Sequence, residues 1–149
     1  MAVDTPLSIT AANVLPGTSA QIRDGILGAG CTATAGQPLY IDTANSNTLQ
    51  LALNSGTALQ ANVCGIALCG GSPGQRIFYD ASDSALVLGC TMTVGDVVYL
   101  GSTAGVLTKA SIDLDTNEYV TILGVCTVAN STIKLSPIVT GAVRTTDQV

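Results

Sequence analysis

None of the 149 residues of this chain is a histidine, so the side chains that could do chemistry are its five cysteines and ten acidic residues. Without histidine there is no Ser-His-Asp or Cys-His arrangement, and the usual general base near neutral pH is missing. An odd number of cysteines predicts no disulfide framework, and only Cys64 and Cys69 are closely spaced, which disfavours a thiolate metal site. We expect thiols that pack as small buried hydrophobes, at Cys31, Cys64, Cys69, Cys90 and Cys126.

Two groups of acidic residues have a spacing that suggests a site. Asp113, Asp115 and Glu118 in SIDLDTNEY could form a carboxylate cluster for Ca²⁺, but the stretch lacks the glycine and the terminal glutamate of an EF-hand loop. A solvated loop between strands is the preferred interpretation. Asp80 and Asp83 in FYDASDSA are interpreted as turn residues, because Asp hydrogen-bonds its own backbone in turns. We therefore expect no catalytic, cofactor-binding or metal-binding residues and no enzymatic activity.

Phosphate, nucleic-acid and membrane binding are also disfavoured. The stretch CGGSPGQ at 69–75 is glycine-rich but lacks the Lys-Ser/Thr pair of a P-loop, so we expect a strand connection there. The net charge is −5 and the five basic residues are scattered, which predicts no nucleic-acid binding. No apolar run approaches the roughly 20 residues of a spanning helix. The N-terminus, MAVDTPLSIT, has no basic region before an apolar core and predicts no secretory signal.

The elements that would position any site are indicated by an internal repeat. GCTATAGQPLY at 30–40 recurs as GCTMTVGDVVY at 89–99, an offset of 59, and the same offset relates Gly65 to Gly124. Both glycines lie inside long apolar, β-branched runs, which predict central strands buried on both faces, with a bulge or a close backbone approach at the glycine. We expect one domain over 1–149, with an N-terminal arm (1–24), repeat one (30–69), repeat two (89–128) and a C-terminal tail (137–149).

Short apolar runs separated by Gly, Asn and Ser predict an all-β fold, an antiparallel β-sandwich or barrel built from the two tandem repeats after an extended N-terminal segment. The stretch 18–28, TSAQIRDGILG, is the only helical candidate, with Thr or Ser as a cap and Gly as a stop. The expected strands are 37–42, 48–53, 61–69, 75–80, 85–88, 96–100, 106–108, 119–128 and 131–136.

Composition predicts an oligomer. The chain is 47% hydrophobic but only 10% charged, where about 25% charged is typical, and a large exposed apolar area usually marks an interface. Apolar side chains near the N-terminus would be costly to expose on a mobile arm, so we expect them to reach a neighbouring subunit, and the tail to be similarly extended. The candidate interface residues are Leu7, Ile9, Val14, Leu15, Val143 and Arg144.

Five segments resemble, in the same order, the small β-rich decoration (capsid cement) proteins of tailed bacteriophages. They are SITAANVLPGTSAQI, GCTATAGQPLYIDTANSNTLQLA, ANVCGIALCGGSPGQRIFY, ALVLGCTMTVGDVVYLGSTAGVLT and YVTILGVCTVANSTIKL, and they cover nearly the whole chain. The resemblance implies a non-enzymatic virion protein, made in the host cytoplasm, that forms homo-oligomers, commonly trimers, and binds the major capsid protein on the outer shell. The five cysteines depart from the family pattern.

Two other functions remain open. A head-fibre, tail-fibre or spike component would share the β-rich, trimer-prone composition, although no elongated repeat or heptad stalk is present. A carbohydrate-binding module is the third possibility, but such sites favour exposed aromatic side chains, and this chain has four Tyr, one Phe and no Trp.

Overall fold

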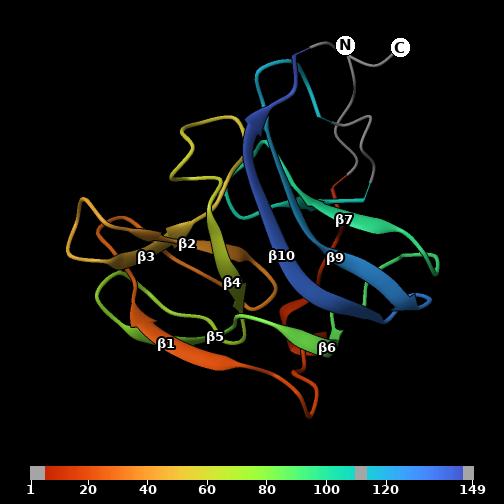
Figure 1. Cartoon of the computed structure of the whole chain (residues 1–149). Coiled ribbons are helices and arrows are strands. Elements are labelled where there is room, and N and C mark those ends of the chain that lie inside the picture. Colours follow the sequence, from red (N-terminus) through yellow and green to blue (C-terminus); the bar gives the residue numbers. More distant parts are fainter. Residues whose placement is uncertain (1–5, 110–113, 146–149) are drawn as a thin grey trace.

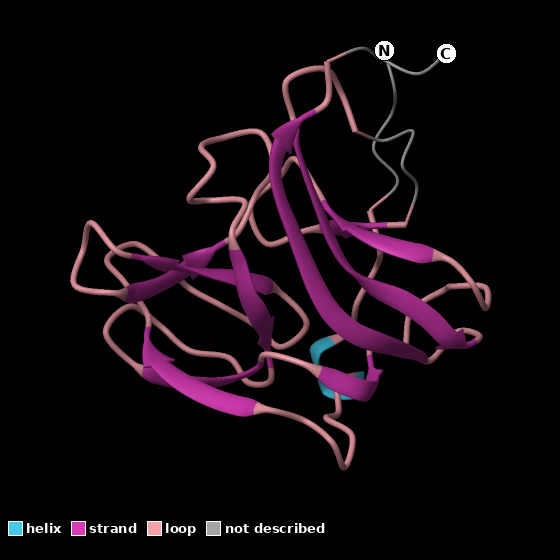
Figure 2. Ribbon diagram, viewed as in Figure 1, coloured by secondary structure: helices cyan, strands magenta, loops and turns pink. Residues whose placement is uncertain are grey.

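A computed structural model describes residues 6–109 and 114–145 of the chain. Strands account for nearly all of its regular structure, with one short 3₁₀ helix (Figures 1 and 2). The elements in chain order are η1 (Ala11–Asn13), β1 (Ile22–Ile26), β2 (Pro38–Asp42), β3 (Thr48–Leu51), β4 (Val63–Ala67), β5 (Arg76–Asp80), β6 (Asp83–Val87), β7 (Val97–Leu100), β8 (Leu107–Thr108), β9 (Tyr119–Val128) and β10 (Thr132–Val143).

The strands form two five-stranded antiparallel sheets. The first sheet has the order β1-β5-β4-β2-β3 and the second has the order β6-β10-β9-β7-β8 (Figure 1). The predicted all-β, antiparallel fold is therefore confirmed, and two separate sheets make it a sandwich rather than one closed barrel. Each sheet has the same internal order, because β1 to β5 occupy the same relative places as β6 to β10.

The pairing of β2 with β4 in the first sheet recurs 59 residues later as the pairing of β7 with β9 in the second sheet. Leu39 of β2 lies opposite Gly65 of β4, and Val98 of β7 lies opposite Gly124 of β9. A register shift follows both pairs, as expected for a bulge. A side chain at either glycine would overlap a backbone carbonyl oxygen of the neighbouring strand, so the predicted close backbone approach is also confirmed.

The turn that precedes β2 is built like the turn that precedes β7. The backbone N–H of Thr34 donates to Oε1 of Gln37 over 2.9 Å, and that of Thr93 donates to a carboxylate oxygen of Asp96 over 2.8 Å. A side chain that accepts a hydrogen bond from a residue three positions earlier holds a tight turn. The repeated sequence motif thus encodes the same entry into a strand in both sheets.

Two hydrophobic cores lie against the sheets. Tyr40 of β2 and its cross-strand partner Val63 lie in a large core, whereas Leu39, the neighbour of Tyr40, points to the opposite face and lies in a smaller one. In the second sheet, Val98 and Leu100 of β7 lie in the large core. The first sheet is therefore packed on both faces, and the large core joins one of those faces to one face of the second sheet.

The structure corrects the helix predicted at 18–28. Residues Ile22–Ile26 form strand β1, which pairs antiparallel with β5 along its whole length. Ile22 and Ile26 have helical spacing, but the five-residue pairing with β5 satisfies the backbone N–H and C=O groups of this stretch. Tertiary pairing therefore overrides the local pattern.

The predicted tail at 137–149 is also wrong over its first part. Strand β10 continues from Thr132 through Pro137 to Val143. Pro137 lies within a register shift between Leu135 and Ile138, where the missing N–H of proline breaks no ladder hydrogen bond. The strand therefore continues past the proline instead of ending at it.

Candidate interaction surface

The N-terminal segment that was predicted to be an arm packs on its own chain. Val14 is only 5% exposed in the large core, and Leu7 and Ile9 pack against that core. The N–H of Leu7 donates to the carbonyl of Leu107 over 2.8 Å, and Leu15 exchanges two backbone hydrogen bonds with β6. Of these four side chains, Leu7, Ile9 and Val14 are therefore buried or partly buried against their own chain, and only Leu15, 58% exposed, faces solvent.

The two predicted interface residues near the C-terminus have different surroundings. Val143 at the end of β10 is 37% exposed. Arg144 holds the loop before β9: its guanidinium donates to the carbonyl of Leu114, and its N–H donates to the carbonyl of Glu118 over 2.9 Å. Its own carbonyl accepts the N–H of Asn117 over 2.7 Å. Arg144 therefore has a structural contact within the chain, whereas Val143 is available at the surface.

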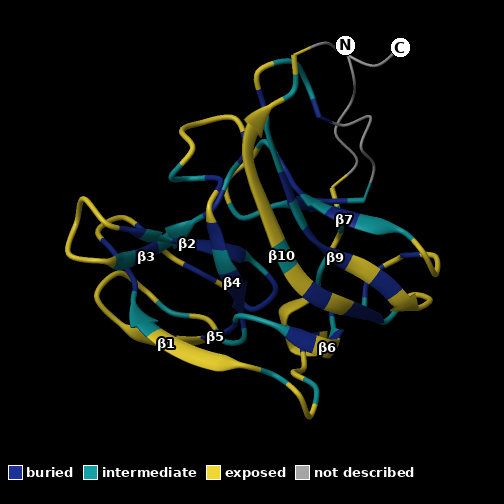
Figure 3. Ribbon diagram, viewed as in Figure 1, coloured by how far each residue is buried: buried dark blue, intermediate teal, exposed yellow. Residues whose placement is uncertain are grey.

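An apolar surface covers the side of the second sheet that faces away from the core. Tyr99 lies opposite Ile122, which lies opposite Ile138, and Val97 lies opposite Val125, so these five side chains share one face. Ile138 is 55% exposed and Val125 is 40% exposed, and the other three side chains are half-buried. We call these five residues the outer face. Figure 3 shows exposed bands along β9 and β10, the two strands that carry Val125 and Ile138.

The outer face breaks the prediction that both long apolar strands are buried on both faces. In β4 the prediction holds at Val63 and Ile66, which are 5% and 0% exposed. Their counterparts 59 residues later are Ile122, half-buried, and Val125, largely exposed. The sequence pattern is the same at both places. The second sheet covers this face of the first sheet, whereas no part of the chain within residues 6–109 and 114–145 covers the outer face.

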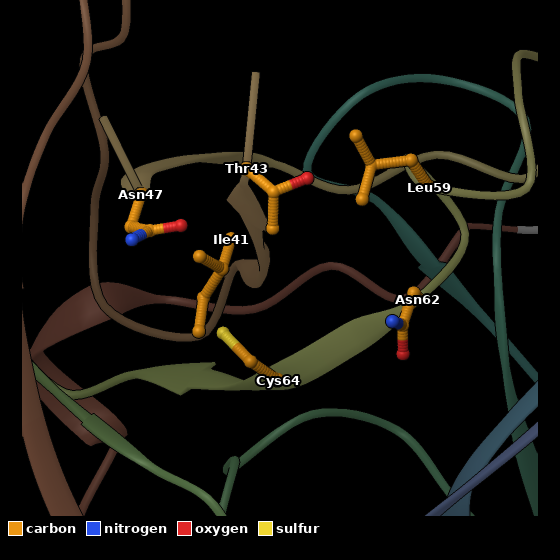
Figure 4. Close-up of a pocket in the computed structure, with 6 residues that line it drawn as sticks. All are labelled: Ile41, Thr43, Asn47, Leu59, Asn62 and Cys64. Atoms are coloured by element: carbon orange, nitrogen blue, oxygen red, sulfur yellow. The ribbon is translucent and has the colours of Figure 1, made fainter. Parts of the chain in front are cut away.

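A hollow of about 510 Å³ opens on the first sheet (Figure 4). Ile41 of β2 and Cys64 of β4 point towards each other at its base. Their counterparts in the second sheet, Leu100 and Leu123, are 0% exposed in the large core. The base of the hollow therefore packs against the smaller core, whereas the matching positions of the second sheet are enclosed in the large core. The lining residues are Ile41, Thr43, Asn47, Leu59, Asn62 and Cys64.

The hollow carries no charged side chain among its lining residues. Burial raises the pKa of Cys64 to about 11, so this thiol is neutral near pH 7. Asn62 and Thr43 are exposed polar residues at the hollow. The hollow thus has an apolar base, with uncharged amide and hydroxyl groups beside it. Protein–protein interfaces have the same arrangement, an apolar centre surrounded by a polar rim.

Asp80 and Asp83 lie on either side of the turn that links the two sheets, as their interpretation as turn residues implies. Both are also buried, which that interpretation did not predict. Asp83 accepts hydrogen bonds from the N–H of Gly17 over 2.6 Å and of Ala85 over 3.0 Å. Burial acts to raise the pKa of Asp83, but these donors outweigh it and the pKa is lowered. Burial, together with the neighbouring Asp83 carboxylate, raises the pKa of Asp80 from 3.8 to about 7. The pair is structural, because it joins β5 to β6 and the segment around Gly17.

The other candidate sites form turns or packing contacts. Asp113 lies outside the described residues, and Oε2 of Glu118 accepts the N–H of Asp115 over 2.9 Å, as in a loop. The glycine-rich 69–75 stretch connects β4 to β5, as predicted. No metal-binding group of three or more His, Cys, Asp or Glu side chains occurs in the part of the chain that the structure describes. All five thiols are free: Cys64 and Cys69 are half-buried, and the fully buried ones are Cys31, Cys90 and Cys126.

Comparison with protein-family models, curated proteins and solved structures found no match for this chain. Within residues 6–109 and 114–145, no helix is long and apolar enough to cross a membrane.

Proposed function

We propose that this protein is a structural virion protein that decorates a bacteriophage capsid. In this proposal it oligomerises on the outer shell, with a trimer favoured, and bridges subunits of the major capsid protein. The observation that carries the proposal is the unpartnered apolar outer face, in a chain whose sequence resembles capsid cement proteins. A surface of this kind on a weakly charged protein marks a protein–protein contact.

The end of β10 adds a second surface for such contacts. From Ile138 to Val143 every residue of this strand is exposed, although a strand in a sandwich normally buries one of its faces. If the outer face and the end of β10 contacted different capsid subunits at once, multivalency would give lasting attachment even if each contact were weak.

The experiment that tests the proposal is a count of this chain in purified virions. Quantitative mass spectrometry should measure its copy number relative to the major capsid protein, with the portal protein as an internal low-copy reference. Near-stoichiometric abundance is expected for a protein that covers the shell. A copy number close to that of the portal would contradict capsid decoration and favour a head-fibre or tail-fibre component, and absence from the virion would reject both.

A further inference from the structure

The hollow on the first sheet has the size of a site for a small molecule. Its volume of about 510 Å³ lies within the range of roughly 300–1,000 Å³ that is typical of ligand pockets. A standard protein interface takes about 20–30 residues from each partner, whereas the hollow is lined by six described residues. The hollow by itself therefore matches a small ligand better than a protein chain.

Two side-chain amides at the hollow are available to a ligand. Asn47 and Asn62 line it, and neither amide makes a hydrogen bond within the described part of the chain. Elsewhere the chain uses amides to hold turns, because Gln37, Gln60 and Gln75 each accept the N–H of the residue three positions earlier. An amide presents two N–H donors and one carbonyl acceptor, so each free amide can bind a group that both donates and accepts.

The apolar part of the hollow is aliphatic. Ile41 and Cys64 form its base, while Asn47 and Leu59 point into the space from opposite sides (Figure 4). Ile41 and Cys64 pack against the smaller core, and Leu59 packs against the large core, which holds these side chains in place. None of the described lining residues is aromatic. A flat ligand such as a nucleobase, which usually stacks on an aromatic side chain, is therefore disfavoured.

We propose that the hollow binds one ring of a neutral saccharide. A sugar ring has a C–H face, which would cover the aliphatic base, and a rim of hydroxyl groups, which both donate and accept hydrogen bonds. Asn47 and Asn62 would bind hydroxyls of the ring, and the hydroxyl of Thr43 provides a third polar contact. None of the described lining residues is charged, so nothing there would pair with the carboxylate of an acidic sugar. The proposal concerns the protein alone and does not depend on capsid binding.

The affinity of this site is expected to be low. The hollow lacks the exposed aromatic side chain that many sugar sites use, and Asn47 and Asn62 are exposed to water in the free protein. Each hydrogen bond to the sugar would replace one to water, so its net contribution is small. We expect a dissociation constant on the order of 1 mM.

The two amides can be removed separately without straining the backbone. Asn47 has a φ of 57°, in the left-handed region that glycine adopts readily, so Asn47→Gly deletes the amide and keeps the turn. Asn62→Ala deletes the second amide. Asn117→Gly is the matched control, because Asn117 is also exposed, has a φ of 71° and does not line the hollow. Urea unfolding would show that all three variants are folded.

Binding would be measured by NMR on isotope-labelled protein titrated with the methyl glycosides of glucose, galactose, mannose and N-acetylglucosamine. At least one glycoside is expected to give saturable shifts in the amide signals of residues at the hollow. Asn47→Gly and Asn62→Ala should each weaken this binding about fivefold, the value of one net hydrogen bond, and Asn117→Gly should bind like the wild type. Glucuronate should bind more weakly than the best neutral glycoside, and glycerol, which has hydroxyls but no ring face, should give no saturable shift.

Three results would overturn the proposal. The first is the absence of saturable shifts with every glycoside up to about 100 mM, a hundred times the expected dissociation constant. The second is a set of shifts centred away from the hollow, or equal shifts with glycerol. The third is an unchanged affinity in either amide variant, or an equal loss in Asn117→Gly.

Discussion

Replacing Asp80 by Asn should remove most of the pH dependence of stability between about pH 5 and pH 8. Asp80 is 0% exposed, beside Asp83, at the link between the two sheets. Its pKa is raised from 3.8 to about 7 by burial and by the carboxylate of Asp83. Asn has the shape of a protonated Asp and cannot ionise, so the variant keeps the form that the folded protein favours.

The sign of the effect follows from proton binding. Between the two pKa values the folded chain holds a proton on Asp80 that the unfolded chain has lost, so the free energy of unfolding falls as pH rises. A shift of about three pH units corresponds to at most about 4 kcal/mol, at 1.36 kcal/mol per unit. Because the unfolded carboxyl is already mostly ionised at about pH 5, about 3 kcal/mol of this loss should occur between about pH 5 and pH 8.

Urea unfolding of the wild type and of Asp80→Asn at several pH values would measure this loss. The chain has no histidine, and no other side-chain type has an ordinary pKa inside this window, so the background is flat. The wild type should lose about 3 kcal/mol over the window, while the variant should change little. Asp24→Asn, which removes a carboxylate 46% exposed on β1, should follow the wild-type curve. Parallel curves for the wild type and Asp80→Asn would refute the reasoning.

Two further predictions concern the packing of the sheets. Gly124→Ala should destabilise the fold by about 3 kcal/mol in urea unfolding, because the added Cβ would overlap a backbone carbonyl of β10, whereas Gly70→Ala, where the nearest atom is 3.2 Å away, should cost far less; equal costs would contradict the close approach. With a thiol reagent on the native protein, Cys69 should react first. Cys64 is half-buried too, but burial raises its pKa to about 11, so it should react more slowly. Denaturant should be needed to label the buried thiols, Cys31, Cys90 and Cys126, and fast native labelling of all five would contradict this burial.

Local patterns were sufficient to predict most strands. Residues 37–42 and 119–128 were predicted from β-branched runs bounded by turn residues, and they contain β2 and β9. The bulges at Gly65 and Gly124 were also predicted from a local pattern, because a glycine inside an apolar strand indicates a bulge or a close backbone approach. The predictions failed where pairing with a distant strand decided the outcome, as for β1 and for the part of β10 beyond Pro137.

The candidate surface was only partly predictable. A hydrophobic chain with few charges indicated an interface, and Val143, one of the predicted interface residues, is exposed. The N-terminal residues were predicted at the interface because exposure would be costly, but Val14 is buried in its own core. The outer face and the hollow were missed, because no sequence signal separates an apolar strand face that the chain covers from one that it leaves open.

The sequence by itself determined most of the strands, the repeated turns and which strands of the two repeats are equivalent, because turn residues, β-branched runs and mid-strand glycines act over a few residues and are present in both repeats. Only the tertiary structure decided that Ile66 is buried while Val125, 59 residues later, is exposed. Burial depends on which sheet face meets another. The second sheet covers the face of the first sheet that carries Ile66, and the described part of the chain leaves the matching face of the second sheet uncovered.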